Sequence, residues 1–358
     1  MRRLAPAFAV LAVLAALAAC SPAPDTSAPD QRPSLADEGL SREQRLRNLL
    51  GALADDSMMG RRTGTEGAAM AARFVASELE RYGVQPAGES GYAQPVPLGL
   101  VERRGRLRPA LPSPDLDLDT LPPGSLLSDE VNLVGIIPGT DPTLREEAVI
   151  IGAHFDHVGV GPAVDGDSIY NGADDDGSGT VAILEIAREL VRTPTKRTLV
   201  ILLSTGEEVG ILGTRWYLEH PVFPLDRTVA DLQIEMIARP DSLAGGPGHA
   251  WLTGYERTTM GDQLAAAGSP IVPDPRPDER FFFRSDNLPF AQRGIPAHTL
   301  SSYNMHGDYH TPADDIDGVD FEHMAAVVDA AVQAVRFLAD GPKPEWKEGG
   351  RDGLTGGR

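Results

Sequence analysis

Short apolar runs alternate with segments of helical spacing from residue 131 onward, and this pattern constrains the fold more than any other feature of the sequence. The runs are rich in Val, Ile and Leu along their whole length, as strands are when both faces of their sheet are covered. Strands that alternate with helices in this way build a sheet between two helical layers. The sequence therefore predicts a three-layer α/β/α sandwich around a mostly parallel mixed sheet. The strands are expected at 131–138, 148–158, 197–204, 231–237 and 295–300, and the helices at 178–191, 211–219 and 321–339.

The segments on either side of the predicted strands are expected to be more varied. Residues 41–82 have helical apolar spacing. Residues 100–123 carry many Pro, Arg and Asp residues with little periodicity, so we expect a surface excursion there. Residues 239–283 are expected to form a long insertion that shapes one wall of a cleft. Residues 341–358 are polar and Gly-rich, and we expect them to form a flexible tail.

The first twenty residues have the composition of an export signal. Arg2 and Arg3 precede an uncharged run that ends at Ala19, and Cys20, the one cysteine of the chain, follows directly. A positive start, an apolar middle and small residues before a cleavage site are typical of a signal peptide, and the run is too short for a membrane span. Its last residues, Leu-Ala-Ala-Cys, resemble the lipobox of bacterial lipoproteins, in which the cysteine becomes the mature N-terminus and carries acyl chains.

This resemblance implies how the chain is divided and where it is located. Residues 1–20 would be a lipoprotein signal peptide with lipidation at Cys20, residues 21–40 a flexible tether, and residues 41–340 one folded domain. The protein would be exported and anchored in the bacterial cell envelope, at the outer membrane facing the periplasm. The lipid anchor would be its only contact with the membrane.

The charge of the chain excludes one class of partner. The 358 residues carry a formal net charge of −20, and the sequence shows no basic patch. Proteins that bind nucleic acid neutralise phosphates with clustered Lys and Arg, so we expect no nucleic acid partner. The sequence leaves the oligomeric state open.

Acidic residues and histidines follow the ends of several predicted strands. Because the carboxyl ends of strands in an open α/β sheet line the ligand crevice, these groups should converge in space. Two imidazoles and several carboxylates without a thiolate suit Zn²⁺, while Mn²⁺ and Co²⁺ remain alternatives. Without metal, the carboxylates would repel one another in a partly dry cleft. The groups are His154-Phe155-Asp156-His157, Asp174-Asp175-Asp176, Glu207-Glu208, Glu235 and Tyr309-His310-Thr311-Pro312.

Glu207 and Glu208 are adjacent at a strand end, where neighbouring side chains point in different directions. One of them can therefore bind metal while the other faces the attacking water. Hydrolysis at two metal ions needs such a carboxylate outside the ligand set, because a base must take the proton of the water and deliver it to the leaving amine.

These motifs, in this order, resemble those of the co-catalytic zinc aminopeptidase family, which includes bacterial leucyl aminopeptidases, glutamate carboxypeptidase and glutaminyl cyclases. The resemblance runs from about residue 49 to 339 and implies the zinc-dependent exopeptidase fold for a metallopeptidase domain at 41–340. Its motifs are His154-x-Asp156-His157, Gly172-Ala-Asp-Asp-Asp-Gly-Ser-Gly179, Ser204-Thr-Gly-Glu-Glu208, Glu235-Met-Ile237 and Tyr309-His-Thr-Pro312.

The resemblance also implies a role for each matching residue. Two Zn²⁺ ions would be bound, the first by His154 and Glu235, the second by Glu208 and His310, with Asp175 bridging both. Glu207 would be the general base, Asp156 would orient His154, and Tyr309 would donate to the oxyanion. The Asp175–Asp176 peptide bond would be cis. Departures from the family are Glu235 for the usual Asp, Ala238 for Gly and Asn287 for a frequent His.

Alternative interpretations exist for several of these residues. We expect His157 and His306 to be ordinary histidines and Asp174–Asp176 to cap the following helix as well as bind metal. Trp216 and Phe281–Phe283 are expected in the core or cleft wall.

The function predicted from the sequence is a zinc-dependent exopeptidase. It would be an aminopeptidase that cleaves N-terminal residues from peptides through a metal-bridging hydroxide. A carboxypeptidase or dipeptidase, a glutaminyl cyclase, a non-catalytic binding module and a structural envelope lipoprotein remain alternatives.

Overall fold

A mixed β-sheet forms the centre of the computed structural model, which describes residues 38–127 and 129–354. Within these ranges the sheet has nine strands, in the order β1-β6-β10-β7-β11-β14-β12-β13, with β2 paired to β6. Strands β10, β7, β11 and β14 are neighbours and parallel. The bounds are β1 Gln85–Pro86, β2 Ala93–Pro95, β6 Val131–Ile137, β7 Ala148–His154, β10 Thr198–Ser204, β11 Thr228–Ile234, β12 Ala250–Leu252, β13 Ile271–Pro273 and β14 Ala297–Ser301.

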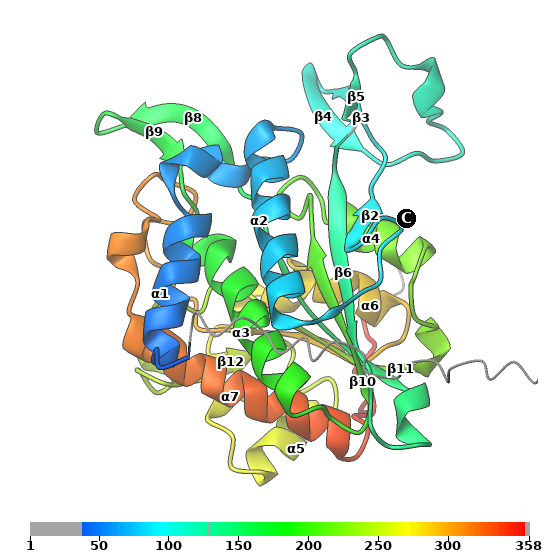
Figure 1. Ribbon diagram of the computed structural model, residues 1–358, viewed down its shortest axis with the longest axis vertical. Helices are drawn as coiled ribbons and strands as arrows, with labels where there is room; N and C mark the ends of the chain where they lie inside the picture. The colour runs from blue at the N-terminus through cyan, green and yellow to red at the C-terminus, as the bar shows by residue number, and fades with distance from the viewer. Residues whose placement is uncertain (1–37, 128, 355–358) are drawn as a thin grey trace, which may run out of the picture. The chain divides into compact units, whose positions relative to one another are not determined.

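Helices cover both faces of the sheet (Figure 1). One layer contains α1, α2, α3 and α7, and the other contains α4 and α6, while α5 lies beside β13. The predicted three-layer mixed α/β fold is therefore confirmed. The bounds are α1 Arg42–Leu53, α2 Glu66–Tyr82, α3 Gly179–Arg192, α4 Leu212–Glu219, α5 Met260–Ala266, α6 Asn287–Gln292 and α7 Phe321–Asp340.

The two layers take alternate side chains from the central strands. Ile151 and Ile201 pack with the residues of α1, α2, α3 and α7. Ile150 and Val200 pack on the opposite face with Tyr217 of α4 and the residues of α6. Successive residues of a strand point to opposite faces, so a run that is apolar throughout can fill both halves of the core.

The segment predicted to be helical over 41–82 contains a break. The helix α1 begins with a capping box, in which Ser41 accepts from the backbone of Gln44 and the Gln44 side chain accepts from Ser41. It ends at Leu53, and α2 begins only at Glu66. Between them, Gly60 has a positive φ, and a Cβ there would lie 2.4 Å from the carbonyl oxygen of Tyr170. The close approach of residue 170 to this turn explains why the helix does not continue.

The surface excursion and the insertion both contain strands. Residues 98–127 form a small sheet with strands β3 Leu98–Arg103, β4 Arg106–Ala110 and β5 Leu126–Leu127. The hairpin of β8 Gly159–Val164 and β9 Asp167–Tyr170 lies at the same end of the molecule (Figure 1). In the insertion, β12 and β13 extend the main sheet, an outcome that its Pro and Gly clusters did not indicate.

The described part of the predicted tail is packed against the domain. Leu354 is only 4% exposed and belongs to the core cluster on the α4 and α6 face. Trp346 donates its indole N–H to the carbonyl of Gly294, and Arg257 donates to the carbonyl groups of Gly350 and Asp352. The prediction of a flexible tail is therefore wrong for residues 341–354, because single apolar anchors hold this polar segment in place.

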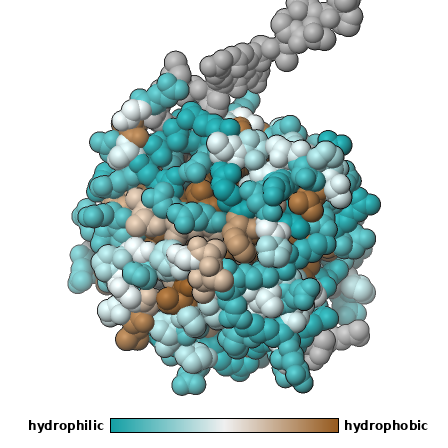
Figure 2. Space-filling model, turned by 90° about the horizontal axis from the view of Figure 1, so that it is seen from below, coloured by the Kyte–Doolittle hydropathy of each residue, from teal (hydrophilic) through white to brown (hydrophobic). Residues whose placement is uncertain are grey.

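Cys20 and the rest of the predicted signal lie outside the described residues. Among the residues that are described, no helix is long and apolar enough to cross a membrane. Figure 2 shows the face seen from below the view of Figure 1, and this face is mainly hydrophilic, with apolar side chains grouped near its centre.

Candidate metal centre

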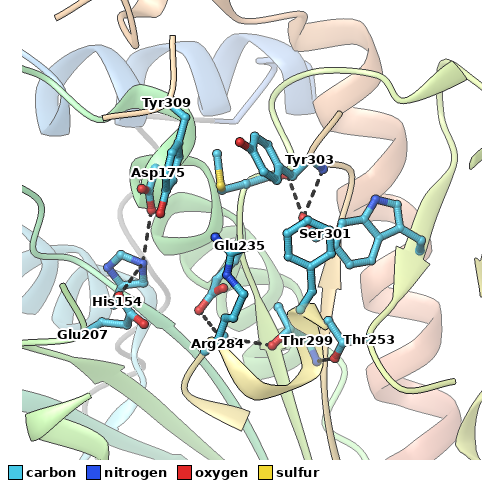
Figure 3. Close-up of a pocket in the computed structure, with 14 residues that line it drawn as sticks. His154, Asp175, Glu207, Glu235, Thr253, Arg284, Thr299, Ser301, Tyr303 and Tyr309 are labelled. Carbon is cyan, nitrogen blue, oxygen red and sulfur yellow. Dashed lines mark hydrogen bonds and ion pairs between the residues drawn. The ribbon is translucent and has the colours of Figure 1, made fainter. Parts of the chain in front are cut away.

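The register of the sheet brings the predicted site residues to one edge. Ser204 of β10 lies opposite His154 of β7, so the loop with Glu207 starts where β7 ends. Gln233 of β11 lies opposite Gly152, which places Glu235 beside the end of β7 as well. Figure 3 shows His154, Glu207 and Glu235 together with Asp175 at one side of a cavity.

His154 presents one ring nitrogen to the other site residues. Its Nδ1 lies 3.0 Å from the carbonyl oxygen of Asp156, which assigns the proton to Nδ1 and leaves Nε2 with a lone pair. Nε2 lies 3.4 Å from Oδ1 of Asp175 and 4.0 Å from Oε2 of Glu207. The carboxylate of Asp156 is farther from Nδ1, at 3.7 Å, so the backbone of this residue supplies the closer contact.

Asp175 lies between two groups of side chains. Its Oδ1 faces His154, and its Oδ2 lies 3.0 Å from Nε2 of His310. The Asp175–Asp176 peptide bond is cis, as the family resemblance implies. One carboxylate therefore reaches a ligand on each side.

The second group contains a residue that was expected to be an ordinary histidine. Nδ1 of His157 lies 2.9 Å and Nε2 of His310 3.1 Å from the same oxygen, Oε1 of Glu208. Ligand atoms of His157, Asp175, Glu208 and His310 all lie within 4.8 Å of one another. His157 follows the His-x-Asp motif directly, and this adjacency was the only signal in the sequence that it belongs to the site.

A separate set of four carboxylates braces the loops around the site, and we call them the bracing carboxylates: Asp156, Asp174, Asp176 and Asp314. All four are buried, and each accepts at least one backbone N–H. Asp176, for example, accepts from the N–H groups of Gly179 and Met236. Carboxylates bonded in this way fix the backbone that carries the ligands.

Four other carboxylates point toward the cavity or the ligand cluster, and we call them the facing carboxylates: Asp175, Glu207, Glu208 and Glu235. Among the described residues, no backbone N–H donates to their side chains. Glu235 accepts from the hydroxyl of Ser285, and Asp175 from His310. Three consecutive aspartates are thus divided between two tasks, because Asp174 and Asp176 brace the loop while Asp175 faces the cluster.

Arg61 supports the site from the turn between α1 and α2. It is fully buried, and its guanidinium donates to the carbonyl oxygens of Leu53, Phe155, Asn171 and Gly172. Arg61 and Asp314 were not predicted as site residues, since neither lies in a motif and only the fold shows what they contact.

Burial and mutual repulsion shape the electrostatics of the facing carboxylates. Burial raises the pKa of Glu235 to about 7, and attraction to His154 opposes that effect. Burial also raises the pKa of Glu207 well above its ordinary value, and repulsion from Glu235 adds to it. For Asp175, contacts with His154 and His310 outweigh burial and hold the pKa well below its usual range. Such crowding of buried acids is relieved by bound cations, so the donor set fits divalent metal.

The cavity beside His154 and Glu235 has a volume of about 90 Å³. Trp251, Phe281 and Tyr303 are among its lining residues, and Figure 3 shows Tyr303 across the cavity from His154. Trp251 and Phe281 come from the segment 239–283, which agrees with the expected cleft wall. Tyr309 also lines the cavity, and its ring stacks on His310 with a centroid separation of 3.9 Å.

The departures from the family pattern have structural explanations in two cases. Asn287 is buried, donates to the carbonyl of Phe282 and accepts from Thr299, so it joins α6 to β14. The N–H of Ala238 donates to Asp174, a contact that needs only the backbone.

Comparisons with known proteins identify a family and relatives of this chain. The model of peptidase family M28 matches residues 132–335. A probable leucine aminopeptidase 2 of Aspergillus oryzae is 30% identical over 171 residues, which are 46% of this chain and 32% of that protein. The chain thus spans about a third of the length of this curated relative.

Solved structures resemble the fold at low sequence identity. BSAP, a zinc aminopeptidase from Bacillus subtilis, has a TM-score of 0.61 and 15% identity, with coverage of 83% of this chain and 95% of that one. Porphyromonas gingivalis glutaminyl cyclase has a TM-score of 0.58 and 15% identity, with coverage of 82% and 97%. The family match covers more than half of the chain and includes all five predicted metal ligands together with Glu207. The chain belongs to peptidase family M28.

Proposed function

We propose that this protein is a zinc-dependent exopeptidase and, more specifically, an aminopeptidase that removes N-terminal residues from peptides. The observation that carries the proposal is the position of Asp175, whose two oxygens face His154 on one side and His310 on the other. A bridging carboxylate between two sets of ligands is the arrangement that a pair of divalent ions requires.

The ligand assignment follows from these positions. His154 and Glu235 would bind one ion, Glu208 and His310 the other, and Asp175 both. Zinc suits imidazole and carboxylate ligands without thiolate, and the relative BSAP is a zinc aminopeptidase. When bound, two such ions lower the pKa of water and polarise the carbonyl group of the substrate.

The chain's own residues supply proton transfer and substrate binding. The Glu207 carboxylate is 4.0 Å from Nε2 of His154 and lines the cavity, so it can take a proton from water there and pass it to the leaving amine. The backbone N–H of Glu207 donates to Asp156, which fixes the start of the Glu207–Glu208 pair. Tyr309 lines the same cavity, and we propose that its hydroxyl donates to the oxygen on which negative charge develops.

The shape of the cavity favours an aminopeptidase. Its volume of about 90 Å³ accommodates one side chain, and the carboxylates of Glu207 and Glu235 that line it can receive an α-ammonium group. The curated relative with 30% identity is a probable leucine aminopeptidase, which also points to substrates with a free N-terminus.

A panel of aminoacyl and acyl-blocked chromogenic peptides tests this proposal. We expect the protein to cleave the free substrates and to leave the blocked ones intact, because only a free amine can contact the carboxylates of Glu207 and Glu235. Equal cleavage of free and blocked peptides would exclude the aminopeptidase assignment.

Glutaminyl cyclase activity is the second candidate, since a cyclase shares the fold with a TM-score of 0.58. Peptides with N-terminal glutamine separate the two activities. Release of ammonia and formation of pyroglutamate would favour the cyclase, whereas release of glutamine would favour the aminopeptidase.

We also propose export and attachment of the protein to the cell envelope through an acylated Cys20, on the basis of the charged start, apolar run and Leu-Ala-Ala-Cys of the sequence. Labelling with a radioactive fatty acid should mark the wild-type protein, and Cys20→Ser should remove both the label and the membrane association. Separation of inner and outer membranes then identifies the membrane that carries it.

A further inference from the structure

We propose that His157 is a fourth protein ligand of the ion assigned to Asp175, Glu208 and His310. The proposal rests on the metal binding proposed above and adds a residue that the family resemblance does not include. It begins with the ring nitrogens of His157, neither of which has a hydrogen-bond partner among the described residues, although the side chain is completely buried.

Other buried histidines of this protein show what a structural role requires. His298 has Thr253 and Thr258 on its two ring nitrogens, each at 2.6 Å. His323 has Gly248 and Ser302 on its nitrogens, each at 2.9 Å. Buried polar groups without partners cost free energy, so an imidazole with two unpaired nitrogens needs another explanation.

The surroundings of Glu208 supply that explanation. Nδ1 of His157 lies 2.9 Å from Oε1 of Glu208, yet this oxygen is also without a hydrogen bond among the described residues. Nε2 of His310 lies 3.1 Å from the same atom. The rings of His157 and His310 are 5.4 Å apart and nearly perpendicular. Nδ1 of His157 and Oε1 of Glu208 thus lie close together without a hydrogen bond between them, as ligand atoms do around a cation.

The fold keeps His157 in this position by several means. The backbone N–H of His157 donates to the backbone carbonyl of Arg61, and His157 forms an isolated β-bridge with Arg62. Gly172 makes room for the ring, since a Cβ on that residue would lie 2.5 Å from it. Because Arg61 also binds the carbonyl of Gly172, the same side chain fixes the loops on both sides of His157.

Four protein ligands on one ion and three on the other would make the two sites unequal. A site whose ligands all come from the protein retains its ion more firmly than one that keeps an open position. The ion beside His157 should therefore dissociate more slowly than the ion beside the substrate cavity.

Zinc titration of metal-free protein tests the role of His157. His157→Phe keeps a ring of similar size and cannot bind metal. We expect it to bind one of two zinc equivalents at least about tenfold more weakly than the wild type does. The matched control is His220→Ala, which removes an exposed histidine that stacks on Trp216 away from the site. Unchanged affinity of His157→Phe for both equivalents would overturn the inference.

X-ray absorption spectroscopy of the wild-type zinc protein gives a second test that requires no variant. We expect three imidazoles per pair of zinc ions, whereas the ligand set without His157 predicts two. A count of two would contradict the role of His157 even if the variant failed to fold. Failure of the wild type to bind any zinc would instead remove the proposed function.

A different observation carries a second inference, which also rests on the proposed function. We infer that a cavity of about 310 Å³ beside Glu208 binds a carboxylate on the leaving side of the peptide. Arg62, Arg106 and Arg108 line this cavity together with His157 and Glu208. Arg106 and Arg108 come from β4 and Arg62 from the turn before α2, so folding brings arginines of two segments to one cavity.

The arginines of this cavity have no partner of opposite charge. Of the residues that the structure describes, none forms an ion pair or a hydrogen bond with the guanidinium of Arg62, Arg106 or Arg108. Arg197, by contrast, pairs with Glu147 at 2.8 Å. In a chain of net charge −20, unpaired guanidinium groups gathered around one cavity provide a site for an anion.

The cavity also has the right position for the leaving part of a substrate. The cavity that contains Trp251 and Phe281 is also lined by His154, Glu207 and Glu235. The cavity that contains the three arginines is also lined by His157 and Glu208. A peptide that crosses the ligand cluster can therefore place its first side chain in one cavity and extend toward the other. The carboxylate would be a C-terminus in a dipeptide or an acidic side chain in a longer peptide.

Three substrates distinguish these sources of charge: Leu-Ala, Leu-Ala-amide and Leu-Glu-amide. We expect the double variant Arg106→Gln and Arg108→Gln to lower kcat/KM at least about tenfold for a substrate with a carboxylate and to leave Leu-Ala-amide unchanged. The control is Arg104→Gln, on the same hairpin outside the cavity lining. Equal changes for all three substrates would overturn this inference, whereas no hydrolysis by the wild type would count against the proposed function.

Discussion

The bracing and the facing carboxylates occupy neighbouring regions of the same sheet edge, yet their surroundings differ. Asp174 and Asp176 are completely buried and bonded to backbone N–H groups, whereas Asp175 between them is 5% exposed and reaches two histidines. The residue type and the position after the strand are the same. In this site, the partner of each carboxylate oxygen, and not the residue type alone, determines whether the residue braces a loop or faces the ligand cluster.

The largest expected effect concerns a facing carboxylate. Glu207→Gln should lower kcat by about 10²- to 10⁴-fold, because an amide cannot take a proton from water. The melting temperature should remain close to that of the wild type, since no backbone group depends on this side chain. Glu256→Gln, at an exposed position, is the control. More than a tenth of the wild-type activity in Glu207→Gln would contradict the assigned role.

Removal of a bracing interaction should act on stability first. Arg61→Met leaves carbonyl groups of Leu53, Phe155, Asn171 and Gly172 without their buried donor. We expect a loss of about 3 kcal/mol in the free energy of unfolding, measured by urea denaturation. The control is Arg62→Met at the adjacent exposed position. Its free energy of unfolding should stay within about 0.5 kcal/mol of the wild-type value. Similar losses in both variants would refute the bracing role.

Removal of bound metal should change the surroundings of the facing carboxylates and leave those of the bracing carboxylates unchanged. Zinc at a hundredfold excess over its dissociation constant stabilises the folded state by about 2.7 kcal/mol, so a chelator should lower the melting temperature by several degrees. Calorimetry with chelator, followed by added zinc, measures this shift and its reversal. Glu207→Gln should show the same shift, because Glu207 is not assigned as a ligand. An unchanged melting temperature in the presence of the chelator would count against bound metal.

The smallest effect is expected at the partner of a facing carboxylate. Ser285→Ala removes the hydroxyl that donates to Glu235 and should weaken binding of one zinc ion by about 1 kcal/mol, roughly fivefold. Zinc titration of the variant beside Ser77→Ala, at an exposed position, measures the change. An affinity equal to that of the control would show that Glu235 needs no orienting donor.

The sequence predicted the sheet and its helices because long apolar runs have few other solutions. The start of β7 and the residues of β10 agree with the structure closely, whereas the strand predicted over 148–158 ends already at His154. It could not predict the break between α1 and α2, since the reason lies in the distant Tyr170. The extension of the sheet by β12 and β13 was also missed, because these strands are only three residues long.

The site residues that lie in sequence motifs could be predicted, and the others could not. The structure brings His154, Asp175, Glu208 and His310 into close contact and places Glu235 on the same cavity. Motifs could not reveal the bracing contacts of Asp174 and Asp176 or the surroundings of His157, because both depend on contacts between segments far apart in the chain.

The turn that carries Arg61 has a practical consequence. The family match begins at residue 132, well after this arginine. A fragment cut at the family boundary would keep all five assigned ligands and lose the guanidinium that ties Phe155 to Gly172. A protease that nicks residues 54–65 could silence the enzyme in the same way, and such cleavage would leave every metal ligand and the base chemically intact.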